Sequence, residues 1–204
     1  MKIPQQLIDS LDGIAGFDKQ AFENVHAFPE QVTSIRINPF KRSMVNGECL
    51  SIHHLPFTAP DSQLPAHPVP WAEHGYHLSR RPSFTFDPLF HAGCYYVQEA
   101  SSMFLEQALK QTIDLSKPIR ILDLCAAPGG KSTHIQSLIT KDSLLVSNDV
   151  IKSRANILKD NIIKWGNDNV VVTNNDAADF AKLENYFDVI VTDAPCSGQR
   201  FIPS

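Results

Sequence analysis

The feature that most constrains this chain is a regular alternation of apolar runs and helix-like segments that begins at Pro118. The apolar runs predict strands at 119–124, 144–147, 170–173 and 188–192. The segments between them predict helices at 131–139, from Ile151 to a stop at Gly166, and at 177–183. Strands that alternate with helices form parallel sheets, because each crossover places a helix on a face of the sheet. We therefore expect a doubly wound α/β sheet, covered on both faces.

The chain before this alternation has a different character. Half of the 14 prolines fall between residues 56 and 88. Because proline fixes φ and lacks an N–H donor, residues 56–90 predict an irregular connector with short extended pieces. The other patterns in this part are a weakly helical start at about 4–26, an alternating strand at 34–38 and a helix at 99–109. The last of these has one apolar face formed by Ala100, Met103, Phe104 and Ala108.

Composition and charge narrow the class of protein. With 43% hydrophobic and 20% charged residues, the chain is neither disordered nor fibrous. It has no membrane-length apolar run, no signal-peptide pattern and only four scattered cysteines, so we expect a reduced, cytoplasmic protein. The net charge of -4 and the pI near 6.0 argue weakly against binding nucleic acid by charge alone. Any binding of RNA or DNA therefore has to come from a local surface whose shape fits the nucleic acid, and not from overall charge.

Acidic residues follow the end of every predicted strand. They are Asp123, Asp149, Asp176 and Asp193. Ligands of doubly wound sheets bind beyond the carboxyl ends of the strands. One acid in such a place is common, because Asp caps helices. Four in succession instead indicate a binding site.

Two classes of ligand compete for this site. Gly130, Lys131 and Ser132 match the end of a P-loop, but the first glycine of that motif would stand at Cys125, where a side chain obstructs the phosphate cradle. A nucleoside cofactor of the adenosine type suits the small-residue turn better. Asp149 stands 19 residues after Gly130, the place of an acid that accepts the ribose hydroxyls. For S-adenosylmethionine, the acidic surroundings also suit a positively charged sulfonium.

Cys196, in a turn after the last strand and beside Asp193, suggests the reaction. A cysteine in this position is placed for nucleophilic or acid–base work. Methylation of carbon 5 of cytosine needs such a group, because a thiolate that adds to carbon 6 turns the ring into an enamine that accepts a methyl group. The other interpretation of Cys196 is a small buried residue at a turn. The same structural role is our interpretation of Cys125.

Around these residues the sequence resembles the Sun/Nol/Nop-type RNA (cytosine-5) methyltransferases, in particular the bacterial ribosomal-RNA branch. The matching segments are 122–132 (Leu-Asp-Leu-Cys-Ala-Ala-Pro-Gly-Gly-Lys-Ser), 193–198 (Asp-Ala-Pro-Cys-Ser-Gly), 153–170, 34–39 and 95–103. The resemblance implies a Rossmann-like S-adenosylmethionine-dependent methyltransferase sheet, here incomplete with about four strands, preceded by a smaller α+β domain. On this basis we expect an N-terminal RNA-binding or pre-catalytic domain at 1–98, with its proline-rich connector. The first part of the catalytic domain would follow at 99–204.

The resemblance also implies roles for individual residues. Those that would line the S-adenosylmethionine site are Cys125, Ala126, Ala127, Pro128, Gly129, Gly130 and Lys131. Asp149 would hold the ribose, Asp176 the adenine edge, and Asp193 would lie between cofactor and target base. Cys196 would assist release of the methylated RNA. The attacking nucleophile of the family belongs to a Thr-Cys motif after the next strand, which this sequence does not contain.

Length supports the same expectation of a fragment. The 87 residues from 118 to 204 accommodate about three β/α units and a last strand, whereas a complete sheet of this kind has six strands. The alternative to an enzyme is a non-catalytic fragment that binds RNA or cofactor. We expect RNA, ribosomal RNA in particular, as the partner, and no membrane.

Two groups of residues stay ambiguous. Six of the eight histidines (His53, His54, His67, His74, His77 and His91) lie in the connector near Cys49 and Cys94. Their spacing matches no standard zinc pattern, so we expect no metal. The second group is basic: Arg36, Arg80 and Arg81 are candidates for contacts with RNA phosphates.

Overall fold

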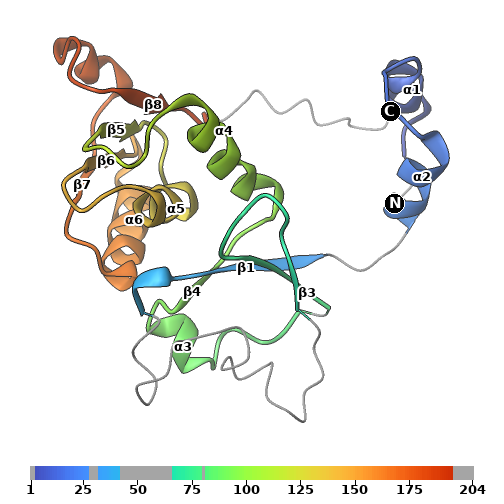
Figure 1. The fold of residues 1–204 in the computed structure, drawn as a ribbon, viewed down its shortest axis with the longest axis horizontal. Helices are drawn as coiled ribbons and strands as arrows, with labels where there is room; N and C mark the ends of the chain where they lie inside the picture. Colours follow the sequence, from blue (N-terminus) through green and yellow to red (C-terminus); the bar gives the residue numbers. More distant parts are fainter. Residues whose placement is uncertain (1–2, 28–31, 42–65, 80, 195–204) are drawn as a thin grey trace. The chain divides into compact units, whose positions relative to one another are not determined.

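The structure is a computed structural model, and it describes residues 3–27, 32–41, 66–79 and 81–194 (Figure 1). Contacts divide the chain into two compact units, residues 1–32 and residues 33–204. The first unit contains α1 (Gln5–Leu11) and α2 (Lys19–Ala27), as the weak helical signal at its start predicts. Ile8 is its buried hydrophobic residue, and α2 buries none. The predicted domain boundary at residue 98 stays a prediction.

The second unit begins with a four-stranded antiparallel sheet. Its strands are β1 (Thr33–Ile37), β2 (Ala66–Pro68), β3 (Gly75–Leu78) and β4 (Tyr95–Val97), in the order β2-β3-β1-β4. The central strand β1 is buried along its whole length, and its Ile35 lies opposite both Tyr76 and Val97. The expected strand at 34–38 is therefore present, one residue earlier than predicted.

The proline-rich connector is more regular than predicted. Residues 56–65 lie outside the described residues, but the part that follows supplies β2 and β3 to the antiparallel sheet. Proline lacks the N–H that a central strand needs, and Pro68 accordingly lies on the edge strand β2. β3 contains no proline and pairs on both sides. The sequence did not predict these strands as paired, because the prolines were counted over the whole of residues 56–90, and β3 itself contains none.

Beyond β3, a short helix, α3 (Pro88–His91), leads into β4. Asp87 caps α3, because its carboxylate accepts a hydrogen bond from the backbone N–H of Leu89 at 2.9 Å. Gly93 follows with φ +70°, and a Cβ there would lie 2.2 Å from the carbonyl oxygen of Lys164. Only glycine permits this close approach of β4 to the helix that carries Lys164.

The helix predicted at 99–109 has a different apolar face from the one expected. The segment begins as a 3-10 turn, η4 (Ser101–Phe104), and becomes α-helical only in α4 (Leu105–Thr112). The tighter first turn shifts the register, so Met103, Glu106 and Leu109 are buried. Phe104 is 57% exposed and Ala108 is exposed, although both were predicted to face the core.

The parallel sheet follows the prediction closely. Its elements are β5 (Arg120–Asp123), α5 (Gly130–Leu138), β6 (Leu144–Asn148), α6 (Lys152–Trp165), β7 (Val170–Thr173), η5 (Ala177–Lys182) and β8 (Val189–Val191). All pairings are parallel, in the order β7-β6-β5-β8. α6 ends at Gly166, whose φ of 101° is the left-handed conformation expected of a helix C-cap. The segment predicted as a third helix is the 3-10 turn η5.

The two faces of this sheet are covered unequally. One face packs against α4, α5 and α6 through Leu109, Ile121, Ile135, Leu145 and Leu158. Alternate strand residues point to the opposite face. There, η5 and the segment after it leave an apolar pocket of about 310 Å³, and Val171 and Ile190 are 48% and 59% exposed. The sheet is therefore covered on both faces, as expected for a doubly wound fold, with α-helices on one face and the 3-10 turn η5 on the other.

A buried arginine joins the antiparallel sheet to α5, the helix that packs on the parallel sheet. Arg36 of β1 is 1% exposed, and each of its five N–H groups has an acceptor. Its Nε donates to Gln98 Oε1 at 2.8 Å, and its two Nη atoms donate to Thr133, Ser137 and Gly130. Burial lowers the pKa of the guanidinium to about 9, so the group stays protonated at neutral pH. The prediction that Arg36 contacts RNA phosphates is therefore wrong, because its donors are already bound inside the protein.

A second buried polar pair joins α4 to α5. The carboxylate of Glu106 accepts from Nε2 of His134 at 3.0 Å and from Nζ of Lys110 at 2.6 Å. Burial opposes the charged form of Glu106, but the hydrogen bonds from His134 and Lys110 lower its pKa to about 2. Burial also lowers the pKa of His134 to about 4, so the imidazole is neutral at pH 7 and donates its Nε2–H. The hydrogen bond therefore joins a neutral imidazole, the donor, to a charged carboxylate, the acceptor.

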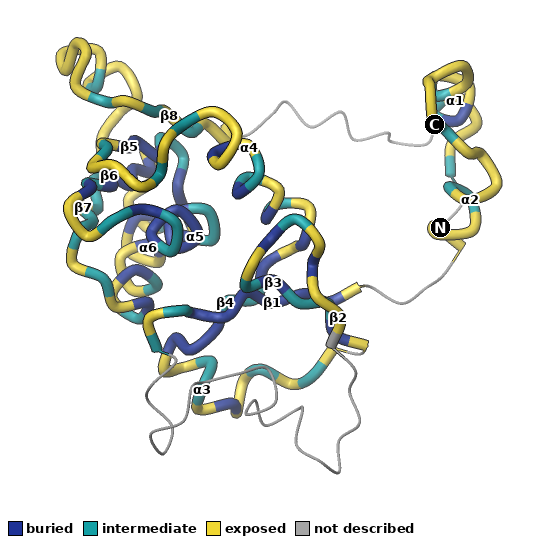
Figure 2. The backbone as a smooth tube through the Cα atoms, in the orientation of Figure 1, coloured by how far each residue is buried: buried dark blue, intermediate teal, exposed yellow. Residues whose placement is uncertain are grey.

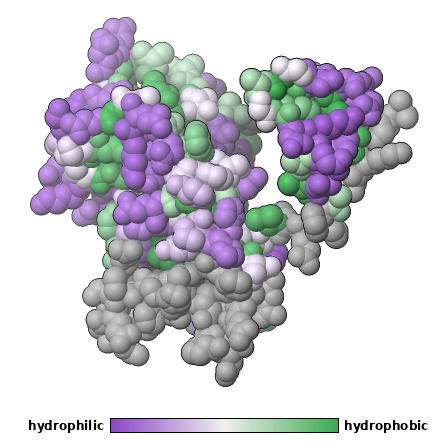
Figure 3. All heavy atoms as spheres, turned by 45° about the vertical axis from the view of Figure 1, so that its right-hand side comes forward, coloured by the Kyte–Doolittle hydropathy of each residue, from purple (hydrophilic) through white to green (hydrophobic). Residues whose placement is uncertain are grey.

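Burial and surface character agree with this architecture. In Figure 2, β1, β5 and β6 are largely dark blue, whereas β7 and β8 contain no buried residue. The loops around α1, α2 and β8 are yellow. Figure 3 shows a mostly hydrophilic surface over the parallel-sheet region, with small hydrophobic patches. Among the described helices, none has the length and apolar character needed to cross a membrane.

We predict that Arg36→Met lowers the free energy of unfolding by at least roughly 2 kcal/mol, because it leaves several buried acceptors without a donor. Urea denaturation followed by circular dichroism measures this change. Arg81→Met is the matched control, since Arg81 is exposed and lies against the ring of Phe84. Equal losses in the two variants would contradict the connecting role of Arg36.

Candidate functional site

The carboxyl ends of the parallel strands meet at one edge of the sheet, where Asn148 holds them together. Its Nδ2 donates to the carbonyl oxygens of Leu124 and Asn175, at 3.2 and 3.0 Å. Its Oδ1 accepts from Thr173 Oγ1 and from the N–H of Asn175, both at 2.9 Å. Asn148 is 1% exposed, so these bonds are shielded from water. One side chain therefore ties together the segments that follow β5, β6 and β7.

The turn after β5 leads directly into α5. Gly129 is the N-cap of α5 with φ 111°, a conformation that favours glycine. A Cβ at this position would also lie 3.2 Å from Cδ1 of Leu158 on α6. The turn is anchored to β6, because the N–H of Ala126 donates to the carbonyl oxygen of Asn148 at 2.7 Å. The small residues of 126–130 therefore keep the backbone close to the neighbouring strand and helix.

Side chains from α6 and β4 hold the carbonyl groups of this turn. Arg154 Nη2 donates to the carbonyl oxygen of Ala127 at 2.8 Å. Asn161 Nδ2 donates to the carbonyl oxygen of Pro128 at 2.8 Å, and the hydroxyl of Tyr96 donates to the same oxygen at 3.4 Å. The turn is therefore held from outside the parallel sheet as well as from within it.

Asp149 lies immediately after β6, and its carboxylate is nearly inaccessible. The residue is 2% exposed, and its Oδ1 accepts from the N–H of Ile151 at 3.0 Å. Its Oδ2 lies 3.5 Å from Nη2 of Arg154. Arg154 therefore contacts both Asp149 and the Ala127 carbonyl, and so it positions two parts of the predicted cofactor site relative to each other.

Asp123, at the end of β5, is fully buried with one oxygen unused. Its Oδ2 accepts from Ser132 Oγ at 2.7 Å, and its Oδ1 has no hydrogen-bond partner in the part of the chain that the structure describes. Burial raises the pKa of Asp123 to about 6, and the charges of Asp193 and Asp149 add to the effect against the hydrogen bond from Ser132. Three of the four strand-end acids therefore influence one another.

Asp193 and Lys131 form an ion pair across the mouth of the site. Nζ of Lys131 donates to the carboxylate of Asp193, whose side chain is 61% exposed. Cys125 lies near the same group of acids. Burial and the charges of Asp149 and Asp123 raise the pKa of its thiol, so it is protonated at neutral pH. A neutral thiol is consistent with the structural role that the sequence favours for Cys125.

Asp176 has the capping role that is common for an acid after a strand. It is exposed, and its carboxylate accepts from the N–H of Ala178 at 2.9 Å as the N-cap of η5. Its other carboxylate oxygen remains available, so the assignment to the adenine edge stays a prediction. Cys196, the predicted auxiliary catalytic residue, lies outside the described residues, as do Cys49, His53, His54 and Arg80.

The geometry argues against a P-loop. In that motif the Ser/Thr hydroxyl binds Mg²⁺ and the Lys reaches phosphate. Here Ser132 is 0% exposed and its hydroxyl is bound to Asp123, while Lys131 is paired with Asp193. Among the described residues, no three His, Cys, Asp or Glu side chains come together as a metal-ligand set.

Sequence reasoning assigned no positioning role to Asn148, Arg154 or Asn161. Each donates to at least one backbone carbonyl oxygen, and such partners leave no signal in a sequence. The spacing of Arg154, five residues after Asp149 at the start of a predicted helix, is the one feature that indicates a contact.

Two protein-family models match this chain, and both describe 16S rRNA methyltransferases. The family model described as 16S rRNA methyltransferase RsmB/F matches residues 110–203, and the family model for the N-terminal domain of 16S rRNA methyltransferase RsmF matches residues 3–100. Ribosomal RNA small subunit methyltransferase F of Escherichia coli O157:H7 is 36% identical over 176 residues, which cover 83% of this chain and 34% of that protein. The same-named protein of Pectobacterium atrosepticum is 38% identical over 142 residues, 66% of this chain and 28% of its own length. The chain thus spans about a third of these relatives.

Solved structures show the same fold. A methyltransferase homolog protein from Pyrococcus horikoshii aligns with a TM-score of 0.69 at 28% identity, over 96% of this chain and 65% of its own. NSun6 from the same organism, solved with SFG, aligns with a TM-score of 0.70 at 19% identity, over 95% of this chain and 71% of its own.

We predict that Asp123→Asn stabilises the chain at neutral pH. A buried carboxyl with a raised pKa favours folding at low pH, and this contribution is lost as the pH rises through about 6. The variant should gain roughly 1–2 kcal/mol in free energy of unfolding at pH 8, and the gain should shrink toward pH 4. Urea denaturation across this pH range tests it, with Asp142→Asn as an exposed control. A gain that does not depend on pH would contradict the assigned cause.

Proposed function

This chain belongs to the 16S rRNA methyltransferase RsmB/F family, and from that membership we propose that it serves S-adenosylmethionine-dependent methylation of carbon 5 of cytosine in RNA. The names of the relatives support small-subunit ribosomal RNA as the substrate, and a cytoplasmic location follows from that substrate. The two family models meet between residues 100 and 110, which supports the division into an N-terminal domain at 1–98 and a catalytic part at 99–204.

The observation that carries the proposal is the group of coupled acids beside a small-residue turn. The turn 125–131 has little side-chain bulk, because Ala126, Ala127 and the two glycines have small side chains or none. Asp123 has an unpartnered buried oxygen there, and Asp149 and Asp193 lie near enough to raise its pKa. A negative, partly unsatisfied site of this kind fits a cofactor with hydroxyl donors and a cationic sulfonium.

Each residue then has a defined task. Asp149, fixed by Ile151 and Arg154, would accept hydrogen bonds from the ribose hydroxyls. The residues that would line the rest of the cofactor are Cys125, Ala126, Ala127, Pro128, Gly129, Gly130 and Lys131, with Asp176 at the adenine edge. The cofactor, when bound, supplies the methyl group. The ion pair of Lys131 and Asp193 places a carboxylate at the mouth of the site, where the target base would enter.

The cytosine itself needs a thiolate at carbon 6 and a base for the proton at carbon 5. The family resemblance assigns the attacking thiolate to a Thr-Cys motif and product release to Cys196. Because the 204 residues include Cys196 but no Thr-Cys pair, our proposal for this chain covers the cofactor site, RNA binding and the auxiliary cysteine. The alternative is a module that binds cofactor or RNA without catalysis. Because the 204 residues hold no Thr-Cys pair, we expect no radiolabelled methyl transfer to ribosomal RNA by this chain alone, and observed transfer would contradict that expectation.

We predict that Asp149→Asn weakens binding of S-adenosylmethionine and S-adenosylhomocysteine by about tenfold or more. The reason is that a charge-assisted hydrogen bond is worth roughly 1.5–3 kcal/mol. Isothermal titration calorimetry on the full chain measures the two dissociation constants. Asp160→Asn, an exposed position on α6, is the control.

Two results would refute this assignment. Unchanged affinity in Asp149→Asn would remove the ribose contact. Heat from ATP but none from S-adenosylmethionine would instead favour the P-loop interpretation.

A further inference from the structure

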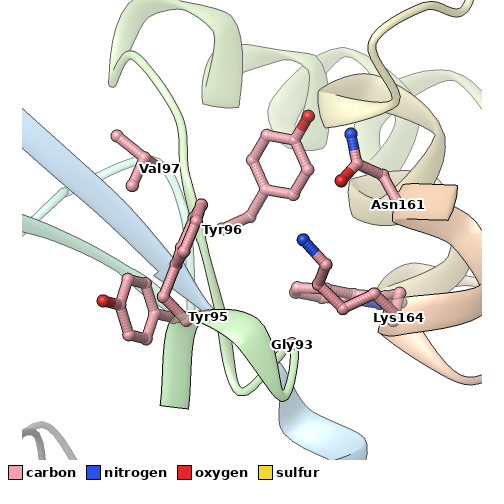
Figure 4. A pocket seen from close by; sticks show the side chains of 8 residues that line it. Gly93, Tyr95, Tyr96, Val97, Asn161 and Lys164 are labelled. Atoms are coloured by element: carbon pink, nitrogen blue, oxygen red, sulfur yellow. The ribbon is translucent and has the colours of Figure 1, made fainter. Parts of the chain in front are cut away.

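We propose that a pocket between β4 and α6 binds one base of the RNA and that Lys164 contacts a neighbouring phosphate. This inference rests on the proposed function, since it concerns how the same RNA is held. The pocket has a volume of about 180 Å³ and includes Phe90, Tyr96, Val97, Asn161, Lys164 and Trp165 in its lining (Figure 4). Its lining includes no residue of the turn 125–131 and none of the strand-end acids, so it is a separate place from the predicted cofactor site.

The size of the pocket suits a fragment of a polymer better than a whole free ligand. Pockets for complete small molecules have volumes of roughly 300–1,000 Å³. A space of about 180 Å³ instead accommodates a single flat ring whose remaining atoms lie outside. A nucleotide within a strand has this form, because the base enters and the sugar and phosphate stay at the rim.

The lining has the chemistry that single-stranded RNA uses. Aromatic side chains bind bases of any sequence by stacking, and Lys binds the backbone. Phe90 and Tyr96 are half-buried, so part of each ring faces the opening. Nζ of Lys164 lies 5.1 Å from the centroid of the Phe90 ring, which places a cation beside the aromatic surface. None of the described residues that line the pocket is acidic.

Polar groups at the pocket can select a base by hydrogen bonds. In Figure 4, Tyr96 and Asn161 reach toward each other across the opening, and Lys164 extends its ammonium toward β4. Trp165 is 1% exposed, and its Nε1 has no hydrogen-bond partner in the described chain.

The pocket is connected to the predicted cofactor site through one peptide group. Tyr96 and Asn161 both donate to the carbonyl oxygen of Pro128, which belongs to the turn 125–131. RNA that contacts these two side chains would therefore affect the position of the turn 125–131, which is predicted to line the cofactor. Because the lining includes none of the strand-end acids, we assign the base held here to a neighbour of the methylated cytosine.

Two variants of the full chain test the proposal. Phe90→Leu keeps an apolar side chain but removes the ring, and Lys164→Gln removes the cation. Lys159→Gln is the matched control, because Lys159 is an exposed residue of the same helix outside the pocket. The probe is a short fluorescent single-stranded RNA, measured by anisotropy at several salt concentrations. A strand of the same length without bases separates base binding from backbone binding.

We expect Phe90→Leu to weaken RNA binding about fivefold or more, the effect of losing one base stack, and to leave the baseless strand unaffected. Lys164→Gln should weaken both strands and reduce the slope of log affinity against log salt by about 0.7. Lys159→Gln should change neither strand. Wild-type affinity for RNA in both pocket variants would overturn the proposal.

Calorimetry with S-adenosylmethionine on the same variants keeps this proposal distinct from the proposed function. Normal cofactor binding with unchanged RNA affinity would refute the pocket alone. A wild-type chain that binds RNA through the pocket but shows no cofactor binding would refute the cofactor assignment and leave the pocket standing.

Discussion

The buried guanidinium of Arg36 is the interaction on which the rest of the second unit depends. A charge removed from water is costly unless every donor finds an acceptor. Arg36 meets this condition without a bonded carboxylate, through Gln98, Gly130, Thr133 and Ser137, and its Cζ lies 4.5 Å from the centroid of the Trp165 ring. The acceptors belong to different elements, so the guanidinium is satisfied only when β1, the segment after β4 and α5 are all in place.

This arrangement makes the antiparallel sheet part of the candidate site. Arg36 of β1 donates to the carbonyl oxygen of Gly130, and Tyr96 of β4 donates to that of Pro128, so two strands of the antiparallel sheet hold the turn 125–131. The parallel sheet holds the same turn through the carbonyl oxygen of Asn148, which accepts from the N–H of Ala126. A turn of small residues has few contacts of its own and would be mobile without these anchors. The first half of the chain therefore contributes rigidity to a site whose charged groups all come from the second half.

Much of the fold could be predicted because apolar periodicity records burial. β7 was predicted to the residue, and the other parallel strands to within one or two residues, since each strand is a short apolar run between turn residues. η5 was predicted as an α-helix because periodicity does not separate a 3-10 turn from an α-helix. β2 and β3 were foreseen as short extended pieces but not as paired strands, because β3 pairs with β1 far along the chain and β2 pairs with β3.

Arg36 shows why the candidate site was less predictable than the fold. An arginine in an alternating strand is ordinarily on the solvent face, and its burial depends on acceptors about 60 to 100 residues away in the sequence. Asn148, Arg154 and Asn161 likewise act on backbone carbonyls, which every residue has. The acids at the strand ends could be foreseen because topology alone brings them to one edge.

The net charge of -4 was a poor guide to binding because it averages two different regions. The acids that follow β5, β6 and β8 are close enough to shift one another's protonation, which suits a cationic ligand and repels phosphate. On the side of α6 that faces β4, Lys164 lies among aromatic rings with no acid in the described lining. Under the proposed function, the acidic edge of the sheet would keep RNA phosphates out of the cofactor site, and Lys164 would hold a phosphate beside it.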